Sequence, residues 1–176
     1  TERLVVRPWT AGSDDLDRIF DLYSRWEVAR WLGASPRVLT DPDQAAGMVD
    51  RWTERADPEG KYGIWAIERR DGGPVVGSVL LVPLPDPDQR GEGEVEVGWH
   101  LHPDSWGHGY ATEAARGAIG KGFSDGLREI YAVVRPDNAP SIAVCRRLGM
   151  TGLGRTERWY GIELEAFRIA PEPAHG

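Results

Sequence analysis

The chain has 176 residues, of which 40% are hydrophobic and 28% are charged, a composition typical of a globular domain with one buried core. Its net charge of −7 is opposite in sign to that of most duplex-binding proteins, so we expect no nucleic-acid partner. A single cysteine excludes an internal disulfide and argues against a bound metal, and no apolar run is long enough to span a membrane. The first residues read as a strand rather than a signal peptide, so we expect a cytoplasmic protein.

The first half of the chain shows apolar periodicities of both helical and strand type, separated by Pro, Gly and Asp. The patterns predict a strand at 4–8, a helix capped by Ser13 or Asp14, a short helical piece at 26–32, a helix that starts at Thr40 or Asp41 and ends before Asp57, and strands at 62–69 and 75–81. The turn between the last two strands is expected at 71–73, where Asp-Gly-Gly favours a hairpin.

The second half predicts a strand, a loop that contains two glycines, and a helix with a face of small residues. The elements expected there are an exposed loop at 83–93, a strand at 95–101, a helix that begins near Thr112, a strand at 130–134, a helix between Asn138 and Gly149, and strands at 155–160 and 163–169. The tally is about seven strands and four helices. We therefore expect an α/β fold with a mixed sheet, a single domain at 1–170, and a disordered tail at 171–176.

The segment between the strand at 95–101 and the helix that follows it could bind an anion. The first amides of a helix lack partners within the helix, and the helix dipole adds partial positive charge there. Gly107 and Gly109 would let the backbone approach a phosphate closely. The spacing fits neither the dinucleotide fingerprint nor the Walker loop, and from the glycines alone an unspecialised connection is an equally good interpretation.

The residue sequence of this segment resembles the motif of a known family. The sequence W-G-H-G-Y-A-T-E-A, preceded by E-V-G-W-H-L-H-P, is similar to the acyl-CoA-binding motif of the GNAT N-acetyltransferases, with Gly109 and Ala111 at its last two fixed positions. Trp106 stands where Gln or Arg is usual, a departure shared by the RimJ/RimL-like branch, which acetylates protein N-termini and some small amines. The segment N-A-P-S-I-A-V-C-R-R-L-G-M, from Asn138 to Met150, resembles a second motif of that branch, in which an aromatic residue is usual at the last position.

The resemblance implies a GNAT-like fold with a central, mostly antiparallel sheet, acetyl-CoA (coenzyme A) as the donor, and an amine as the acceptor. The pyrophosphate would bind the loop amides, the pantetheine arm would follow the strand backbone, and Asn138 and Ser141 would lie near the thioester. The cofactor-binding residues implied in this way are Trp99, His100, Leu101, Trp106, Gly107, His108, Gly109, Tyr110, Ala111, Thr112, Asn138 and Ser141. For the acceptor, the residues are Trp26, Trp31 and Tyr160.

For catalysis, the resemblance indicates Glu96 as the base that accepts the ammonium proton through water. His100 shares its strand face by the period of two and is a second candidate. A structural carboxylate is an equally good interpretation of Glu96. Many members of the family carry a Tyr where this chain has Cys145, which reads better as a small core residue, so Ser141 is the expected proton donor and Tyr160 the alternative.

These observations predict an acetyltransferase that joins the acetyl group of acetyl-CoA to a primary amine by direct attack in a ternary complex. The acceptor is a protein N-terminal α-amine or a small molecule, a longer or succinyl acyl group stays open, and the chain is expected to be a monomer or a homodimer. The alternatives are an acyl-CoA-binding or sensory module without activity, and a nucleotide-binding protein that uses the glycine loop for ATP.

Overall fold

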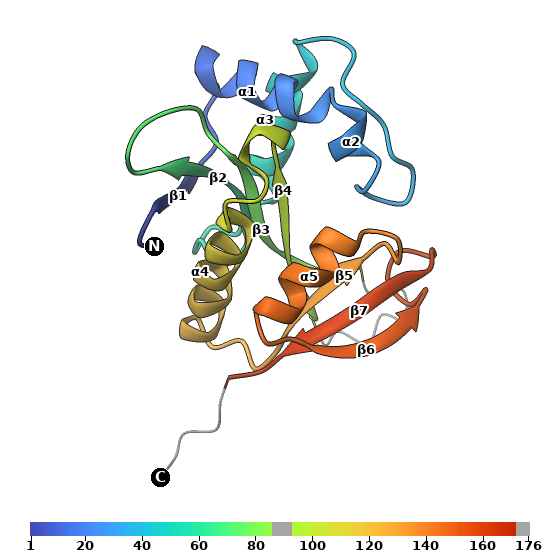
Figure 1. The fold of residues 1–176 in the computed structure, drawn as a ribbon. Helices are drawn as coiled ribbons and strands as arrows, with labels where there is room; N and C mark the ends of the chain where they lie inside the picture. Colours follow the sequence, from blue (N-terminus) through green and yellow to red (C-terminus); the bar gives the residue numbers. More distant parts are fainter. Residues whose placement is uncertain (86–92, 172–176) are drawn as a thin grey trace.

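The computed structural model describes residues 1–85 and 93–171, and these residues form one seven-stranded sheet with five α-helices (Figure 1). The strands are β1 (Leu4–Pro8), β2 (Gly63–Arg69), β3 (Gly77–Pro83), β4 (Val95–Leu101), β5 (Ile130–Val134), β6 (Thr151–Thr156) and β7 (Leu164–Ile169). The helices are α1 (Ser13–Tyr23), α2 (Trp26–Ala29), α3 (Gln44–Arg55), α4 (Tyr110–Ser124) and α5 (Ala139–Arg147), and a 3-10 turn spans Pro103–Ser105.

The order of the strands across the sheet is β1-β2-β3-β4-β5-β7-β6. The first four strands form an antiparallel meander, and α4 then crosses over so that β5 lies parallel to β4. After α5, β6 and β7 form an antiparallel pair in which β7 lies next to β5. The expected α/β fold with a mixed sheet is confirmed, and its strands form a meander followed by a βαβ unit.

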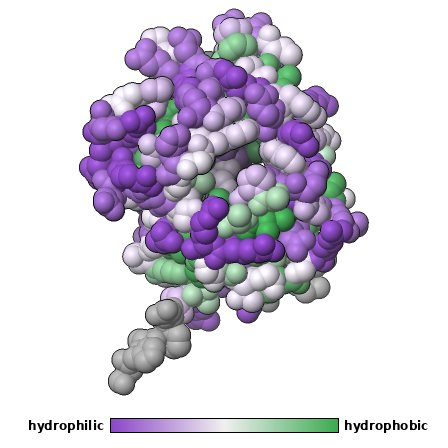
Figure 2. Space-filling model, viewed as in Figure 1, coloured by the Kyte–Doolittle hydropathy of each residue, from purple (hydrophilic) through white to green (hydrophobic). Residues whose placement is uncertain are grey.

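Each face of the sheet is covered by helices, because alternate residues of the central strands are apolar on both sides. On one face, Val95 and Val97 of β4 pack in a buried cluster with Ala114 and Ala118 of α4. On the other face, α1, α2 and α3 contribute a second cluster that includes Ile19, and Figure 1 shows these three helices together at one end of the molecule. Hydrophilic residues cover most of the surface seen in Figure 2.

Several boundaries differ from the sequence prediction. The strand predicted at 155–160 was wrong, since β6 lies at Thr151–Thr156 and the chain turns immediately after it. The residue at the N-cap of α1 is Gly12 rather than Ser13 or Asp14, and it makes no side-chain cap. β3 starts two residues later than predicted and α4 starts at Tyr110.

Two expectations concern residues that the structure does not describe in full. The exposed loop at 83–93 includes residues 86–92, and the disordered tail at 171–176 includes residues 172–176, which lie outside the described ranges. Within 1–85 and 93–171, no helix has both the length and the apolar character needed to cross a bilayer.

Candidate active site

The central feature of the sheet is a gap between its two parallel strands. β3 and β4 stay in register from Gly77↔Leu101 to Pro83↔Val95, whereas β4 and β5 are paired at one position, Glu96↔Tyr131. Beyond Glu96 the two strands therefore diverge toward their carboxyl ends. Ligands of α/β sheets commonly bind at such ends, where the connections to helices leave an opening.

The register of β3 and β4 shows which backbone groups face this gap. Bonds from Leu84 N–H to Glu94 O and from His102 N–H to Val76 O mark residues 94 and 102 as hydrogen-bonded to the β3 side. In an antiparallel pair such residues alternate, so Trp99 directs its N–H and C=O toward β5. No described residue of β5 is in register with Trp99, which leaves these two groups available to a ligand that extends along β4.

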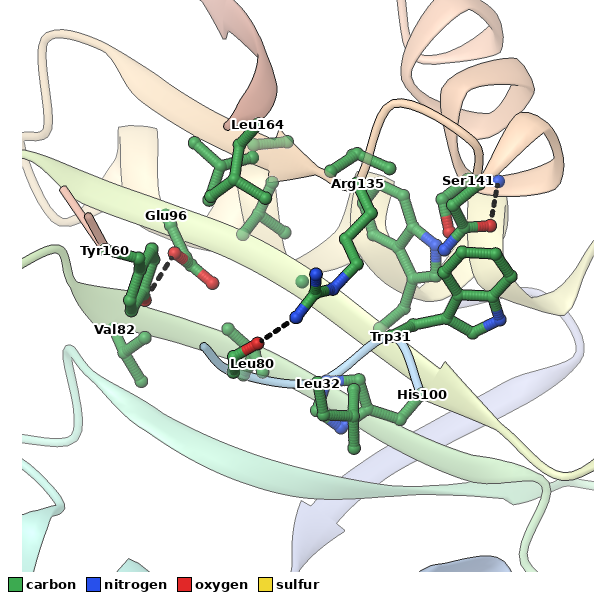
Figure 3. Close-up of a pocket in the computed structure, with 18 of the residues that line it drawn as sticks. Trp31, Leu32, Leu80, Val82, Glu96, His100, Arg135, Ser141, Tyr160 and Leu164 are labelled. Atoms are coloured by element: carbon green, nitrogen blue, oxygen red, sulfur yellow. Dashed lines mark hydrogen bonds between the residues drawn. The ribbon is translucent and has the colours of Figure 1, made fainter. Parts of the chain in front are cut away.

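A cavity of roughly 250 Å³ lies over this gap. β4 and the end of β5 form its floor, and the segment after α2 and the turn before β7 form its sides (Figure 3). Gly98 lies between Glu96 and His100 in the floor and has no side chain that would enter the cavity. The space is tight there, because a Cβ at this position would lie 3.0 Å from the Leu80 side chain. Continuous register across Gly98 means that β4 has no bulge there, and Glu96 and His100 lie on the same face of the strand.

Glu96 is the carboxylate of the cavity. Burial raises its pKa to about 7, and a hydrogen bond that Tyr160 donates to its Oε2 at 2.9 Å opposes part of this increase. Figure 3 shows the two side chains pointing toward each other at one end of the cavity. A carboxyl group with such a pKa exchanges a proton near neutrality, as a general base requires.

The turn that carries Tyr160 is fixed to β4 by a second acidic residue. Glu94 accepts a hydrogen bond from the Trp159 indole at 2.7 Å and forms an ion pair with Arg158 at 3.0 Å. Two carboxylates, Glu96 in β4 and Glu94 directly before it, thus hold two consecutive aromatic residues. The sequence analysis placed Tyr160 in the site, but gave no signal for its partnership with Glu96.

His100 lies deep in the site, beside a buried group of polar side chains. Its Nδ1 is 3.1 Å from the Tyr23 hydroxyl, which is 2.8 Å from Ser78 Oγ, and Trp9 donates to the same Ser78 oxygen. Burial lowers the pKa of His100 to about 4, so its ring is neutral at physiological pH. A neutral imidazole can accept the hydrogen bond that the Tyr23 hydroxyl is positioned to donate.

The start of α5 contributes Asn138 and Ser141 to the cavity wall. Asn138 is buried, and its side-chain oxygen accepts from the Ser141 N–H at 3.3 Å, which caps the helix as the sequence predicts. Within the described chain the Ser141 hydroxyl makes no hydrogen bond of its own. Cys145, one turn further, is fully buried in the core, and burial raises its pKa to about 12.

The glycine loop lies at the other end of the connection from β4. Gly109 has φ 78° and precedes α4, whose first backbone bond runs from Glu113 N–H to the Gly109 carbonyl. The amides of Tyr110, Ala111 and Thr112 therefore come before the first helical bond and lack partners in the helix. The Thr112 hydroxyl is buried, and it has no partner among the described residues. These groups form a cradle suited to a phosphate.

An arginine from the start of the chain supports this loop. Arg3 donates to the His108 carbonyl at 2.9 Å, pairs with Glu113 at 2.7 Å, and places its guanidinium 5.0 Å from the centre of the Tyr110 ring. The imidazole of His108 stacks on the same ring at 5.4 Å. The loop is thus fixed by contacts with Arg3, which directly precedes β1 and lies far from the loop in the sequence.

The structure brings most of the expected site residues together. Those that line the cavity are Trp31, Glu96, Trp99, His100, Asn138, Ser141 and Tyr160. Trp26 is 55% exposed and does not line it, Leu101 belongs to the core, and the Trp106 indole donates to the Leu101 carbonyl at 2.9 Å. The main residue that the sequence analysis missed is Arg135, although a charged residue directly after a buried strand was a usable signal.

Comparisons with known proteins agree on one family. A family model described as an acetyltransferase (GNAT) domain matches residues 3–151. The uncharacterized N-acetyltransferase YoaA of Bacillus subtilis is 33% identical over 151 residues, which cover 85% of this chain and 80% of YoaA.

Solved structures show the same fold. A putative ribosomal-protein-serine acetyltransferase from Vibrio cholerae superposes with a TM-score of 0.76 at 18% identity, over 97% of this chain and 95% of that one. The spermidine N-acetyltransferase of Vibrio cholerae, solved in complex with CoA and spermine, has a TM-score of 0.72 at 16% identity, over 97% and 96% of the two chains. At these identities the likeness concerns the fold alone.

Proposed function

Because the chain belongs to the GNAT acetyltransferase family and is therefore an acyltransferase, we propose that it transfers the acetyl group of acetyl-CoA to a primary amine. The reaction is a direct attack within a ternary complex, as in the RimJ/RimL-like branch. The observation that carries this proposal is the gap between β4 and β5, which exposes the Trp99 backbone next to the half-buried carboxylate of Glu96, with a pKa of about 7. The acceptor is a small molecule or a protein N-terminal α-amine.

Residues on both sides of the gap fit the donor. The amides of Tyr110, Ala111 and Thr112 would hold the pyrophosphate, with the Thr112 hydroxyl as a further hydrogen-bonding group. The amide groups of the pantetheine arm would pair with the N–H and C=O of Trp99, in place of the strand that is missing there. Asn138 and Ser141 would then flank the thioester.

The chemistry requires that the ammonium group of the acceptor lose a proton before attack. Glu96 accepts this proton, and the neutral nitrogen forms a bond to the thioester carbonyl carbon as the carbon–sulfur bond breaks. After attack the nitrogen loses a second proton, and the departing CoA thiolate takes up one proton, so the step is balanced. Ser141, which lines the cavity, donates the proton to the thiolate. In this scheme His100 stays neutral and orders the floor of the cavity through Tyr23.

The first test is calorimetric titration with acetyl-CoA, free CoA and ATP, followed by an acetylation assay over amines and N-terminal peptides. We expect micromolar-range binding of acetyl-CoA, no binding of ATP, and turnover of at least one amine class. Failure of both CoA species to bind would refute the assignment of the gap and the glycine loop.

The second test compares Glu96 with Glu94, the carboxylate that directly precedes β4. Glu96→Gln should lower kcat by about 100-fold or more without weakening acetyl-CoA binding, because a general base contributes roughly 10²–10⁴-fold. Glu94→Gln is the matched control, since Glu94 lies two residues away, faces the same side and does not line the cavity. Equal activity in the two variants would remove Glu96 as the base.

A further inference from the structure

A positively charged side chain crosses the cavity. Arg135 follows the last residue of β5 and extends between the Glu96–Tyr160 pair on one side and Trp31 on the other (Figure 3). One of its terminal nitrogens, Nη2, donates to the Gly33 carbonyl at 2.8 Å. Its Nε is buried and has no hydrogen-bond partner within residues 1–85 and 93–171.

Within residues 1–85 and 93–171, no carboxylate forms an ion pair with the guanidinium of Arg135. The hydrogen bond that this side chain makes there is to a neutral peptide carbonyl, which leaves its charge uncompensated by the described residues. A guanidinium has five N–H donors, so most of them stay available after the Gly33 bond is made. Arg135 is half-buried and its Nε is shielded from water, so a ligand that supplies a negative charge and accepts these hydrogen bonds would be bound favourably.

The arrangement places opposite charges in one cavity without direct contact between them. Glu96 and Tyr131 are partners in the β4–β5 register, and alternation along β5 puts Arg135 on the same side of the sheet as Glu96. We propose that the acceptor carries a carboxylate as well as its amine. Its ammonium group lies at Glu96, and its carboxylate binds the free donors of Arg135. The substrate class is therefore amino acids, and this inference rests on the proposed acetyl transfer.

The carboxylate is assigned to the acceptor rather than to a dicarboxylic acyl donor for a geometric reason. The donor would reach the gap from the α4 and α5 face, where the glycine loop and Ser141 lie. Arg135 extends from the opposite face, toward Gly33 in the segment after α2. The indole of Trp31 beside it offers an apolar wall for the acceptor side chain.

The experiment measures kcat/KM for the common L-amino acids, β-alanine and γ-aminobutyrate, each beside its carboxamide, in wild type, Arg135→Ala and Arg135→Lys. We expect the carboxylate form to be preferred, and the preference to fall about 30- to 100-fold in Arg135→Ala, because charge-assisted bidentate hydrogen bonds are among the strongest. Arg135→Lys should restore part of it. Arg146→Ala, an exposed arginine on α5, is the control and should leave the preference unchanged.

The ratio of kcat/KM between each acid and its carboxamide distinguishes loss of carboxylate recognition from a structural effect of losing the Arg135–Gly33 hydrogen bond. A structural change in the cavity would lower kcat/KM for both forms alike and leave the ratio unchanged. Turnover of amines with no preference for the acid would overturn the inference while the proposed function stands. The same variants are also assayed with succinyl-CoA in place of acetyl-CoA. A loss of activity in Arg135→Ala that is confined to succinyl-CoA would assign Arg135 to the donor and overturn the inference.

If acetyl-CoA does not bind, the proposed function fails. Calorimetry of the same acids with the protein alone then decides the carboxylate site separately. Binding that is lost in Arg135→Ala supports the site, and absence of binding by every acid overturns it.

Discussion

Replacing Tyr160 by Phe tests how the protonation of Glu96 is controlled. The phenol donates a hydrogen bond of 2.9 Å to the carboxylate and so favours its ionised form. A hydrogen bond to a charged group contributes about 1.5–3 kcal/mol, and one pKa unit corresponds to about 1.4 kcal/mol, so the pKa of Glu96 should rise by roughly one to two units in Tyr160→Phe. The ring is retained, so packing of the turn should change little.

The assay is the pH dependence of kcat/KM. Because Glu96 must be ionised to act as a base, activity rises with pH through its pKa of about 7. A rise of about one unit leaves roughly a tenth of the carboxyl groups ionised near pH 7 instead of half, so the rate falls about fivefold there and recovers by about pH 9. Tyr131→Phe is the control, since it removes a 2.7 Å bond to Glu129 outside the cavity. An unshifted profile in Tyr160→Phe would refute the reasoning.

Three further predictions follow from burial and backbone geometry. The pKa of Glu96 is raised from 4.5 to about 7 in the folded chain, so wild type loses stability as the pH rises between these two values, where the unfolded state ionises first. Glu96→Gln should therefore match wild type near pH 4 and be more stable by roughly 3 kcal/mol of unfolding free energy above about pH 8, as measured by chemical denaturation; a gain that does not depend on pH would contradict this. Gly109→Ala and Gly126→Ala both put a side chain at positive φ, so each should lower the free energy of unfolding by about 1–2 kcal/mol. Calorimetry should show weaker acetyl-CoA binding in Gly109→Ala alone, because only Gly109 lies in the proposed phosphate loop. Cys145→Ala should keep its activity while Ser141→Ala turns over more slowly, because the Cys145 thiol is buried in the core; the reverse ranking in a thiol-release assay would reassign the proton donor.

The order of strands and helices could be predicted because most elements have one buried face. β6 is the exception, since it lies at the edge of the sheet and its residues are largely exposed, so no apolar alternation marks it. Its register also shifts between Gly152 and Gly154, and Gly154 has φ 86°. Aromatic residues are typical of strands, so Trp159 and Tyr160 favour a strand at 155–160 over one at 151–156. In the structure these two side chains lie in a turn and bind Glu94 and Glu96.

The site was predictable where its residues belong to a local motif and not where distant segments meet. Asn138 caps α5 and Gly109 precedes α4, and both roles depend on near neighbours in the sequence. The contact of Arg135 with Gly33 joins residues 102 apart, and that of Tyr160 with Glu96 joins residues 64 apart. No local periodicity encodes such contacts, which position Arg135 and Tyr160 inside the cavity.

The single pairing between β4 and β5 has a consequence for how the molecule unfolds. Across that line, one backbone position joins a half-sheet of β1 to β4 to a half-sheet of β5, β7 and β6, so the link between the halves depends mainly on the packing of α4 and α5. A pantetheine arm paired with Trp99 would add rungs to the ladder where the chain supplies none. Acetyl-CoA would thus act as an eighth strand. The unfolding of the two half-sheets should therefore be more strongly coupled, and closer to a single cooperative transition, when acetyl-CoA is bound.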